Sequence, residues 1–380
     1  MMSSFDVIVL GAGTWGSAAS WQLATRGYRV LAIDAFRPPH KVGSHGGATR
    51  LARQSNSSGP AYIKLTEAAW EMWGEVSKKV GQDILVKTGS AFIGEPGSEW
   101  FDKTLSNLQK SEFEYEVLSN AESSSRFPWL KTRERELTVW EPNGSIILVE
   151  PAIHSLQKLA SEHGVEFRFD EPVLTWNADA SGVGVRTAQG TYRADKLVVT
   201  AGARSNRILN LDLPVDVERQ VLVNFKVPAG HVALPALFFA APPGDPGMPA
   251  YGCPEPDGTY KFSVATRMDI IDPDTISQDI KANDVERVRE VLRQRLPQLD
   301  AEPVGGAVCM WSESKDGHWL LGAHPDHRNV VIGAGCTGRG FRYAPVVGKA
   351  LADFVDGTER PDLDTFTTAR FNLKNSEVTK

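Results

Sequence analysis

The sequence has only three cysteines among its 380 residues, Cys253, Cys309 and Cys336. An odd number of widely separated cysteines argues against a disulfide framework and against a chelating zinc pair. No apolar run reaches the 18 residues of a membrane span, and Asp6 interrupts the apolar stretch near the N-terminus, which no Lys or Arg precedes. We therefore expect a cytoplasmic protein in a reducing compartment, with no membrane partner and no metal site.

A basic block is also missing. The 41 Lys and Arg residues are outnumbered by 47 Asp and Glu residues, and the net charge of −6 is spread along the chain. This distribution argues against nucleic acid or an anionic membrane as a partner. Apolar residues make up 41% of the chain, which is typical of a soluble globular protein, and the length predicts two or three domains.

The N-terminal segment carries a glycine-rich motif between a strand and a helix. An apolar run over residues 6–10 leads into Gly11-x-Gly13-x-x-Gly16, and an alanine-rich helical pattern follows up to Gly27. In this arrangement Gly11 makes the turn, Gly13 lets a pyrophosphate approach the backbone, and Gly16 lets helix and strand pack closely. The free N–H groups of the helix N-terminus then face the phosphates.

A second apolar strand over residues 30–33 ends at Asp34. A carboxylate about 20 residues beyond the glycines accepts hydrogen bonds from a ribose and repels a 2′-phosphate. The motif therefore predicts FAD or NAD rather than NADP. The alternative, a βαβ unit that binds nothing, leaves three correctly spaced glycines unexplained.

The rest of the chain alternates helical and strand patterns, which predicts an α/β protein with a discontinuous Rossmann-like dinucleotide-binding domain and a second, β-rich substrate domain. We assign residues 1–80, 145–210 and 304–380 to the first domain, and residues 81–144 and 211–303 to the second. Helices are predicted over residues 61–76, 100–110, 151–163, 283–296 and 345–354. Strands are predicted over residues 90–93, 164–169, 183–187, 191–193, 196–200, 219–225, 259–265, 306–311 and 329–332.

A second G-x-G-x-x-G lies near the C-terminus, at Gly333, Gly335 and Gly338. Asp356 follows at a suitable distance, but a helix precedes this acid where a nucleotide site requires a strand. We interpret the motif as a glycine loop whose helix dipole faces the same cofactor.

Several motifs together identify a family resemblance. The chain resembles the FAD-dependent amine oxidases of the D-amino acid oxidase superfamily, specifically the monomeric sarcosine oxidase and N-methyltryptophan oxidase group. The resemblance implies FAD as the cofactor and oxidation of a secondary amine to an imine. It also implies that O2 is reduced to hydrogen peroxide. It is carried by FDVIVLGAG, DAFRPPH, GSHGGATRLAR, EPNGSIILVE, ADKLVVTAGA, IDPDT, GAVCMWS and NVVIGAGCTGRGF.

The resemblance also implies a covalent flavin. Cys309 in GAVCMWS matches the cysteine to which this family attaches the flavin 8α-methyl as a thioether, whereas a lone cysteine in an apolar strand is more often buried packing. The predicted cofactor residues are Gly11, Gly13, Thr14, Trp15, Gly16, Asp34, Ala35, Ser44, His45, Thr49, Arg50, Gly202, Cys309, Gly335, Gly338, Arg339, Gly340, Phe341 and Arg342.

Further residues match positions that act on the substrate. Arg53 and Arg342 match the cations that bind a substrate carboxylate, and two guanidinium groups can do so by parallel hydrogen bonds. Arg50 matches the arginine beside the flavin, and Lys261 matches the lysine held to assist electron transfer to oxygen. If the resemblance is set aside, the alternative for Arg50 and Arg53 is a solvated basic loop. The alternative for Lys261 is a surface lysine whose ammonium reaches solvent. Tyr251 matches a tyrosine that lines the substrate cavity.

Three positions depart from the sarcosine oxidase pattern. Ala265 and Arg339 stand where histidines are found, and Trp311 replaces a tyrosine. These changes argue against sarcosine itself as the substrate, but not against flavin chemistry. We therefore expect Lys261, Arg50, Tyr251, Arg53, Arg342 and Trp311 to form the catalytic site of a monomeric oxidase.

We expect this oxidase to act on a small N-methyl or N-alkyl amino acid through its carboxylate, with O2 as the acceptor. The alternatives are a fructosyl amino acid oxidase, an FAD dehydrogenase that does not use oxygen, and a dinucleotide-binding module without turnover.

Overall fold

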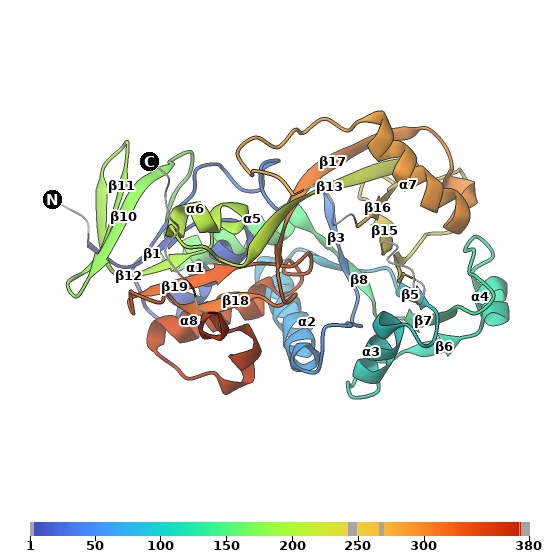
Figure 1. Cartoon of the computed structure of the whole chain (residues 1–380), viewed down its shortest axis with the longest axis horizontal. Coiled ribbons are helices and arrows are strands. Elements are labelled where there is room, and N and C mark those ends of the chain that lie inside the picture. Colours follow the sequence, from blue (N-terminus) through green and yellow to red (C-terminus); the bar gives the residue numbers. More distant parts are fainter. Residues whose placement is uncertain (1–3, 242–248, 266–269, 372, 374–380) are drawn as a thin grey trace.

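The computed structural model describes residues 4–241, 249–265, 270–371 and 373. In this part of the chain, two large mixed sheets lie toward opposite ends of the long axis, and a small three-stranded sheet accompanies them (Figure 1). The fold is α/β, as the sequence predicts. None of the described helices combines the length and the apolar character that a membrane span requires.

The first sheet has a parallel core in the order β9-β2-β1-β12-β19. Strand β2 and residues 7–10 of β1 are continuous apolar runs that are buried on both faces, which is typical of a parallel sheet covered by helices. The strands of this sheet are β1 (Ser4–Leu10), β2 (Val30–Ile33), β9 (Glu166–Arg168), β10 (Val173–Asp179), β11 (Gly182–Thr187), β12 (Thr191–Val199), β18 (Leu320–Ala323) and β19 (Val330–Ala334).

Strand β12 corrects one prediction. The two strands expected over residues 191–193 and 196–200 form one continuous strand, because its first half pairs antiparallel with β11 while its second half pairs parallel with β19. Strand β1 runs parallel to β12 along the whole length. Ala194, which lies between the two predicted strands, pairs with Phe5 of β1 and with Val183 of β11, so the chain stays in the sheet there.

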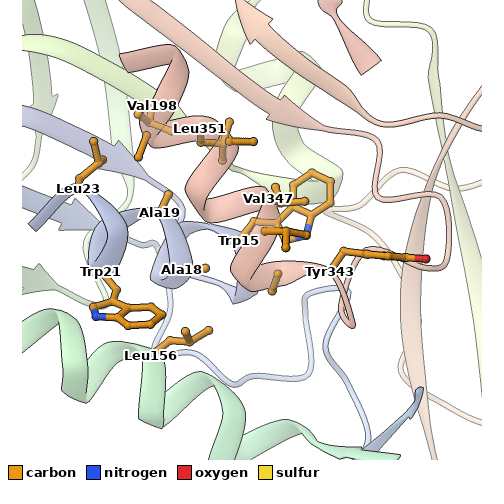
Figure 2. Close-up of a cluster of buried hydrophobic side chains, with 14 of the residues drawn as sticks. Trp15, Ala18, Ala19, Trp21, Leu23, Leu156, Val198, Tyr343, Val347 and Leu351 are labelled. Carbon is orange, nitrogen blue, oxygen red and sulfur yellow. The ribbon is translucent and has the colours of Figure 1, made fainter. Parts of the chain in front are cut away.

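Helices pack against the first sheet around α1 (Thr14–Thr25). The close-up in Figure 2 shows Trp15, Ala18 and Ala19 of α1 beside Val347 and Leu351 of a neighbouring helix. The helices cross closely at Gly348, where a Cβ atom would lie 2.5 Å from a backbone carbon of Ala18. The helices of this layer are α2 (Ala61–Val80), α5 (Val149–Glu162) and α8 (Ala344–Asp356).

The second sheet follows the order β17-β13-β16-β15-β14-β5-β7-β6. Its long pair β13 and β17 extends toward the first sheet (Figure 1). The strands are β5 (Ser90–Gly94), β6 (Glu116–Leu118), β7 (Leu137–Glu141), β13 (Val215–Lys226), β14 (Ala236–Phe239), β15 (Ala250–Pro254), β16 (Thr259–Val264) and β17 (Pro303–Ser314). The helices beyond the first layer are α3 (Glu99–Leu108), α4 (Asn120–Arg126), α6 (Ser205–Leu209) and α7 (Ala282–Arg295).

Strand β17 bears on the expected domain boundary at residue 304. This strand starts at Pro303 and pairs with β13 along its length, so it lies in the second sheet and not beside the nucleotide strands. The boundary is therefore better placed after β17, and the division into domains stays a prediction.

The small sheet contains β3 (Thr49–Ala52), β4 (Leu85–Lys87) and β8 (Ser145–Leu148), with β8 in the middle. The loop after Asp34 therefore ends at Thr49, and residues Thr49 to Ala52 form an ordered strand. This strand brings the basic segment 49–53 to both large sheets, as the contacts described below show.

Candidate functional site

The first glycine motif forms the turn that the sequence predicts. Gly11 has a φ of +91°, and a Cβ atom there would lie 2.5 Å from the carbonyl oxygen of Thr200. A Cβ atom on Gly16 would lie 1.7 Å from the carbonyl oxygen of Gly11, so this glycine is required for packing of helix against strand. At Gly13, by contrast, the nearest atoms belong to the His45 ring at 3.7 Å. Protein packing alone does not require a glycine there, whereas a bound pyrophosphate would.

Asp34 lies at the end of β2 beside this turn. Its carboxylate accepts hydrogen bonds from the backbone N–H groups of Ala12 at 2.7 Å and Phe36 at 2.9 Å. Burial raises the pKa of this carboxyl group to about 6, against the lowering effect of the two hydrogen bonds. Above that pH an anion with acceptor capacity faces the cavity described next, which fits ribose hydroxyls and disfavours a 2′-phosphate.

A long cavity extends from this turn. Its empty space, including its opening to solvent, is about 1290 Å³, and its lining runs from the first glycine turn to the second glycine loop. Fifteen predicted residues line it: Gly11, Gly13, Thr14, Trp15, Asp34, Ala35, Ser44, His45, Arg50, Gly202, Trp311, Gly335, Gly338, Gly340 and Phe341. The other predicted residues lie outside this lining, namely Gly16, Thr49, Arg53, Tyr251, Lys261, Cys309, Arg339 and Arg342.

The second glycine loop lines the same cavity as the first. The indole Nε1 of Trp15 donates to the carbonyl oxygen of Gly340 at 2.9 Å, which joins the two loops directly. Asp356 receives hydrogen bonds from Arg26 at 2.5 Å and from Tyr28 at 2.6 Å. Its carboxylate is thus engaged at the surface of the helix layer. The two glycine loops line one cavity, and a cofactor shared by both stays a prediction.

The loop between β2 and β3 holds Arg50 and His45 at the cavity wall. The Arg50 guanidinium donates to the carbonyl oxygens of Ser44 at 3.0 Å and Gly46 at 2.7 Å, and lies 5.5 Å from the ring centre of Phe341. Burial, together with the neighbouring His40 and Arg50, lowers the pKa of His45 to about 3. His45 is therefore a neutral ring at physiological pH, and Arg50 supplies the positive charge.

Lys261 is buried, with 4% of its side chain exposed, so the snorkelling alternative is wrong. Its ammonium contacts three oxygen atoms: the carbonyl oxygen of Thr49 at 2.6 Å, the hydroxyl of Thr49 at 2.7 Å, and Oε1 of Glu255 at 2.7 Å. The Thr49 hydroxyl also donates to Oε1 of Glu255. All three ammonium protons thus have acceptors inside the protein.

The sequence did not point to Glu255, although its carboxylate completes this network. Glu255 follows β15 in the turn Glu-Pro-Asp-Gly, and its N–H donates to the carbonyl oxygen of Thr259 at 2.9 Å. A glutamate in such a turn usually faces solvent. Only the register of the β15–β16 hairpin, in which Cys253 lies opposite Lys261, brings the carboxylate to the ammonium.

Cys309 is buried in β17, next to two residues that line the cavity, Met310 and Trp311. A Cβ atom on Gly46 would lie 3.4 Å from the Cβ of Cys309, so the loop between β2 and β3 packs closely against this residue. Burial raises the thiol pKa, and the charges of Arg50 and Lys261 act in the opposite direction. Cys253 and Cys336 are also free.

Arg53 and Arg342 are brought together by the segment that follows β3. Arg53 is 9% exposed, and its guanidinium lies 4.1 Å from the ring centre of Phe238 and 5.1 Å from that of Phe92. Arg342 is 5% exposed and donates to the carbonyl oxygens of Arg53 and Ser55. Burial and the nearby Arg342 lower the pKa of Arg53 to about 9.

Glu141 is the acid that holds this segment, and the sequence did not reveal it. Its buried carboxylate accepts from the N–H groups of Gln54 at 2.6 Å and Ser55 at 3.1 Å, and from the hydroxyl of Ser90 at 2.9 Å. Among the described residues, no carboxylate oxygen lies within 4.0 Å of a guanidinium nitrogen of Arg53. The arginine is therefore near a negative charge but has no direct acid partner.

Tyr251 and Trp311 stack with ring centres 6.1 Å apart and planes 21° apart. Trp311 lines the cavity, and the Cβ position of Gly338 is 3.1 Å from its indole ring. Burial raises the pKa of the Tyr251 hydroxyl, which therefore stays protonated at neutral pH. Ala265 is buried at the end of β16, so its methyl group occupies a position where a histidine would be larger and polar.

The residues present fit FAD: an open glycine turn at Gly13, a ribose acceptor at Asp34 and a cation at Arg50 line one elongated cavity. No cluster of three or more His, Cys, Asp or Glu side chains with metal-binding geometry occurs among the described residues. The glycine turn, Asp34 and Arg50 fit an organic cofactor that carries phosphate groups.

Comparison with known proteins agrees with this geometry. The family model described as FAD dependent oxidoreductase matches residues 6–354. The monomeric sarcosine oxidase of Bacillus sp. (strain B-0618) is 33% identical over 389 residues, which cover 99% of this chain and 98% of that protein. The N-methyl-L-tryptophan oxidase of Salmonella agona (strain SL483) is 29% identical and covers 97% of this chain and 99% of its own length.

The solved structure of NikD, an unusual amino acid oxidase essential for nikkomycin biosynthesis, superimposes with a TM-score of 0.85 at 24% identity. The match covers 96% of this chain and 97% of NikD, and it shows the shared fold. The chain therefore belongs to the family of FAD-dependent oxidoreductases and resembles the monomeric sarcosine oxidases and N-methyltryptophan oxidases within it.

Proposed function

We propose that this enzyme oxidises the C–N bond of an N-substituted amino acid, a secondary amine, to an imine that hydrolyses. Bound FAD would accept two electrons from the amine and pass them to O2, which gives hydrogen peroxide. The relatives are named as oxidases of sarcosine and N-methyl-L-tryptophan, both N-methyl amino acids. The observation that carries the proposal is the buried guanidinium of Arg53, which no carboxylate contacts among the described residues.

A substrate carboxylate would supply the partner that Arg53 lacks. The two aromatic rings of Phe92 and Phe238 restrict its guanidinium, and burial makes the charge costly without an anion. Arg342 offers a second guanidinium in the same place, and its buried Nε has no hydrogen-bond partner within the described structure. Two such groups favour a carboxylate because each can donate two parallel hydrogen bonds.

Protein groups that could act as a general base are not needed in this reaction. An amine that binds in its neutral form can lose a hydride equivalent from the adjacent carbon once it is oriented. Tyr251 remains protonated at neutral pH, since burial raises its pKa, so it can donate a hydrogen bond but not remove a proton. Trp311 would instead shape the cavity wall, and the Tyr251 ring stacks against it.

We also propose that the FAD is covalently attached through Cys309. Forming a thioether from a thiol and a ring methyl group releases two electrons and two protons, which O2 accepts as hydrogen peroxide. The positive charges of Arg50 and Lys261 support the reactive thiolate, because both lower the thiol pKa against the effect of burial. The neighbouring Met310 and Trp311 line the cofactor cavity.

Two further features belong to the proposal. We take the enzyme to be a monomer, as the relatives' names indicate for those proteins, and to act in the cytoplasm, which three free cysteines suit. Light scattering of the purified protein tests the first point. A mass of twice 41.5 kDa would contradict it.

A peroxide-coupled screen tests the proposed reaction. The substrates are N-methyl, cyclic and fructosyl amino acids, each followed in parallel by anaerobic bleaching of the flavin. Bleaching and peroxide with N-alkyl amino acids support the proposal. Preference for the fructosyl compounds supports the deglycating alternative, whereas bleaching without oxygen consumption indicates a dehydrogenase. A protein that none of these amines bleaches refutes amine oxidation.

A further inference from the structure

Three arginine side chains converge on the short segment from Arg53 to Ser58. Arg53 donates to the Ser55 hydroxyl at 3.4 Å, and Arg342 donates to the carbonyl oxygen of Ser55 at 3.3 Å. Arg339 donates to the Ser58 hydroxyl. None of the three guanidinium groups forms an ion pair with an acid of the described chain. Each also lies against an aromatic ring, so the cluster is walled by apolar surface.

The local charge is not balanced by the protein. Glu141 holds the same segment and supplies one negative charge. Asp316, the acid on the Arg339 side, is already bound by Arg370 at 2.7 Å. Three guanidinium groups against one carboxylate leave an excess of two positive charges, of which one belongs to the half-buried Arg339. A single substrate carboxylate would neutralise the excess charge of the buried pair Arg53 and Arg342, and it would leave Arg339 without an anion.

Arg339 is separated from the cofactor cavity. It belongs to the second glycine loop, but it does not line the cavity that the other loop residues line. Its Nε donates to the carbonyl oxygen of Thr337 at 3.1 Å, and its guanidinium lies 5.8 Å from the ring centre of Tyr62. Together with its contact to Ser58, these contacts place the Arg339 guanidinium beside the segment after β3, which Arg342 also contacts.

We propose, resting on the amine oxidase function above, that the substrate is an N-carboxyalkyl amino acid whose second carboxylate is bound by Arg339. Arg53 and Arg342 bind the first carboxylate, and the secondary amine lies between the two acids. Ser55 and Ser58 are three residues apart, so their Cα atoms are separated by at most about 11 Å. That span suits a compact molecule with one carboxylate on each side of the nitrogen.

Iminodiacetate and sarcosine form a suitable pair of probes. Iminodiacetate is sarcosine with one methyl hydrogen replaced by a carboxylate, so the comparison isolates the second acid. Its oxidation removes two hydrogens from a C–N bond and transfers them to O2 as hydrogen peroxide. Water then adds to the imine, and glyoxylate and glycine are released.

The experiment compares kcat/KM for the two probes in the wild type and in Arg339→Gln. Wild-type enzyme should prefer iminodiacetate, and Arg339→Gln should lower the ratio of the two values by about 10- to 100-fold, because a charge-assisted contact is lost. Arg339→Lys keeps the charge without the planar fork and should retain part of the ratio. Arg135→Gln is the matched control, since it removes an exposed arginine that pairs with Glu95. Its ratio should equal that of the wild type.

The outcomes distinguish this inference from the proposed function. A wild type that oxidises sarcosine at least as well as iminodiacetate overturns the inference, without any variant having to fold. Equal loss for both probes in Arg339→Gln also overturns it and assigns Arg339 to the cofactor or to the loop. If neither probe nor any other N-substituted amino acid bleaches the flavin, the proposed function itself fails.

Discussion

The network of Lys261, Glu255 and Thr49 leads to a quantitative prediction about oxygen. Transfer of one electron to O2 creates an anion, and the proposed role of Lys261 is to stabilise it with a fixed charge. Glu255 places a carboxylate oxygen 2.7 Å from the ammonium nitrogen. The energy of the anion therefore depends on both charges of the ion pair, and Lys261 and Glu255 can each be replaced separately.

The size of each effect follows from Coulomb's law. At an effective dielectric constant of about 20, an anion about 5 Å from the ammonium gains roughly 3.3 kcal/mol. If the carboxylate lies directly behind, at about 7.7 Å, it costs roughly 2.2 kcal/mol, so the pair contributes roughly 1.1 kcal/mol. A difference of about 1.36 kcal/mol changes a rate tenfold. The ammonium therefore corresponds to a factor of about 300, the carboxylate to about 40 and the pair to about six.

We therefore expect Lys261→Met to slow reoxidation by O2 by about 300-fold if Glu255 keeps its charge. The double variant Lys261→Met/Glu255→Gln should be only about sixfold slower than wild type, and Glu255→Gln alone should be about 40-fold faster. Stopped-flow measurement of both half-reactions checks these rates. Anaerobic reduction by substrate should change much less in every variant. Lys226→Met, at the exposed end of β13, is the matched control.

Stability measurements accompany the kinetics. Lys261→Met leaves the nearly fully buried carboxylate of Glu255 without its ion partner, which should lower the free energy of unfolding by about 3 to 5 kcal/mol. The double variant should recover part of this loss. Equal slowing of both half-reactions, or no difference between single and double variants in rate or stability, would refute the reasoning and assign Lys261 to strand packing or substrate orientation.

Three further predictions address the cofactor and the substrate. Denatured wild-type protein should retain flavin fluorescence on a gel and Cys309→Ala should lose it, whereas flavin released intact from the wild type by acid excludes the thioether. Arg53→Ala and Arg342→Ala should each lose about 2 to 5 kcal/mol of transition-state binding for an acid substrate, and little for its ester. Equal losses for acid and ester would contradict carboxylate binding. The third prediction concerns the Kd for FAD, measured in Cys309→Ala so that the proposed thioether cannot form. The Kd should rise about tenfold on going from pH 7 to pH 5. The reason is that Asp34, with its raised pKa of about 6, becomes protonated and loses an acceptor for the ribose. Fluorescence titration checks this, and Asp34→Asn should bind weakly with no such pH dependence.

The sign of the Asp34 effect on stability is opposite to its effect on binding. Its folded pKa of about 6 lies above the ordinary value of an aspartate, because burial disfavours the charged form, so the folded state without cofactor favours the protonated form. The resulting stabilisation is complete below about pH 4 and is lost as pH rises through about 6. Cofactor binding uses the ionised form, which the fold disfavours by burial. Asp34 thus serves the ligand at some expense to the stability of the free protein.

The sequence predicted the parts of the fold that depend on local patterns. Glycine spacing and apolar runs located the turn at Gly11, strand β2 and the longer helices, because these features follow from backbone geometry and burial. The short helices α4 and α6 were not predicted. The continuity of β12 was missed because two different neighbours hold its two halves in the sheet. Local sequence patterns do not show which distant strands will pair with a given segment.

The candidate site shows the same limit. Arg53, Arg342 and Lys261 could be named from motifs, but their acid neighbours Glu141 and Glu255 could not. Each glutamate acts through a contact made by folding, across 86 or 87 residues for Glu141. A carboxylate at the end of a strand or in a turn has an ordinary sequence context, so only the assembled register shows that it is buried beside a cation.

The five residues from Thr49 to Arg53 connect the chemistry of the two large sheets. Thr49 contacts the ammonium of Lys261 in the second sheet, while Arg50 lines the cavity that begins at the nucleotide strands. Arg53 then lies against aromatic side chains of β5 and β14. Because side chains alternate along β3, one short strand can present groups to both sheets without a bend. A displacement of β3, which pairs with β8 in the small sheet, would therefore move the proposed oxygen site, the cofactor wall and the carboxylate site together.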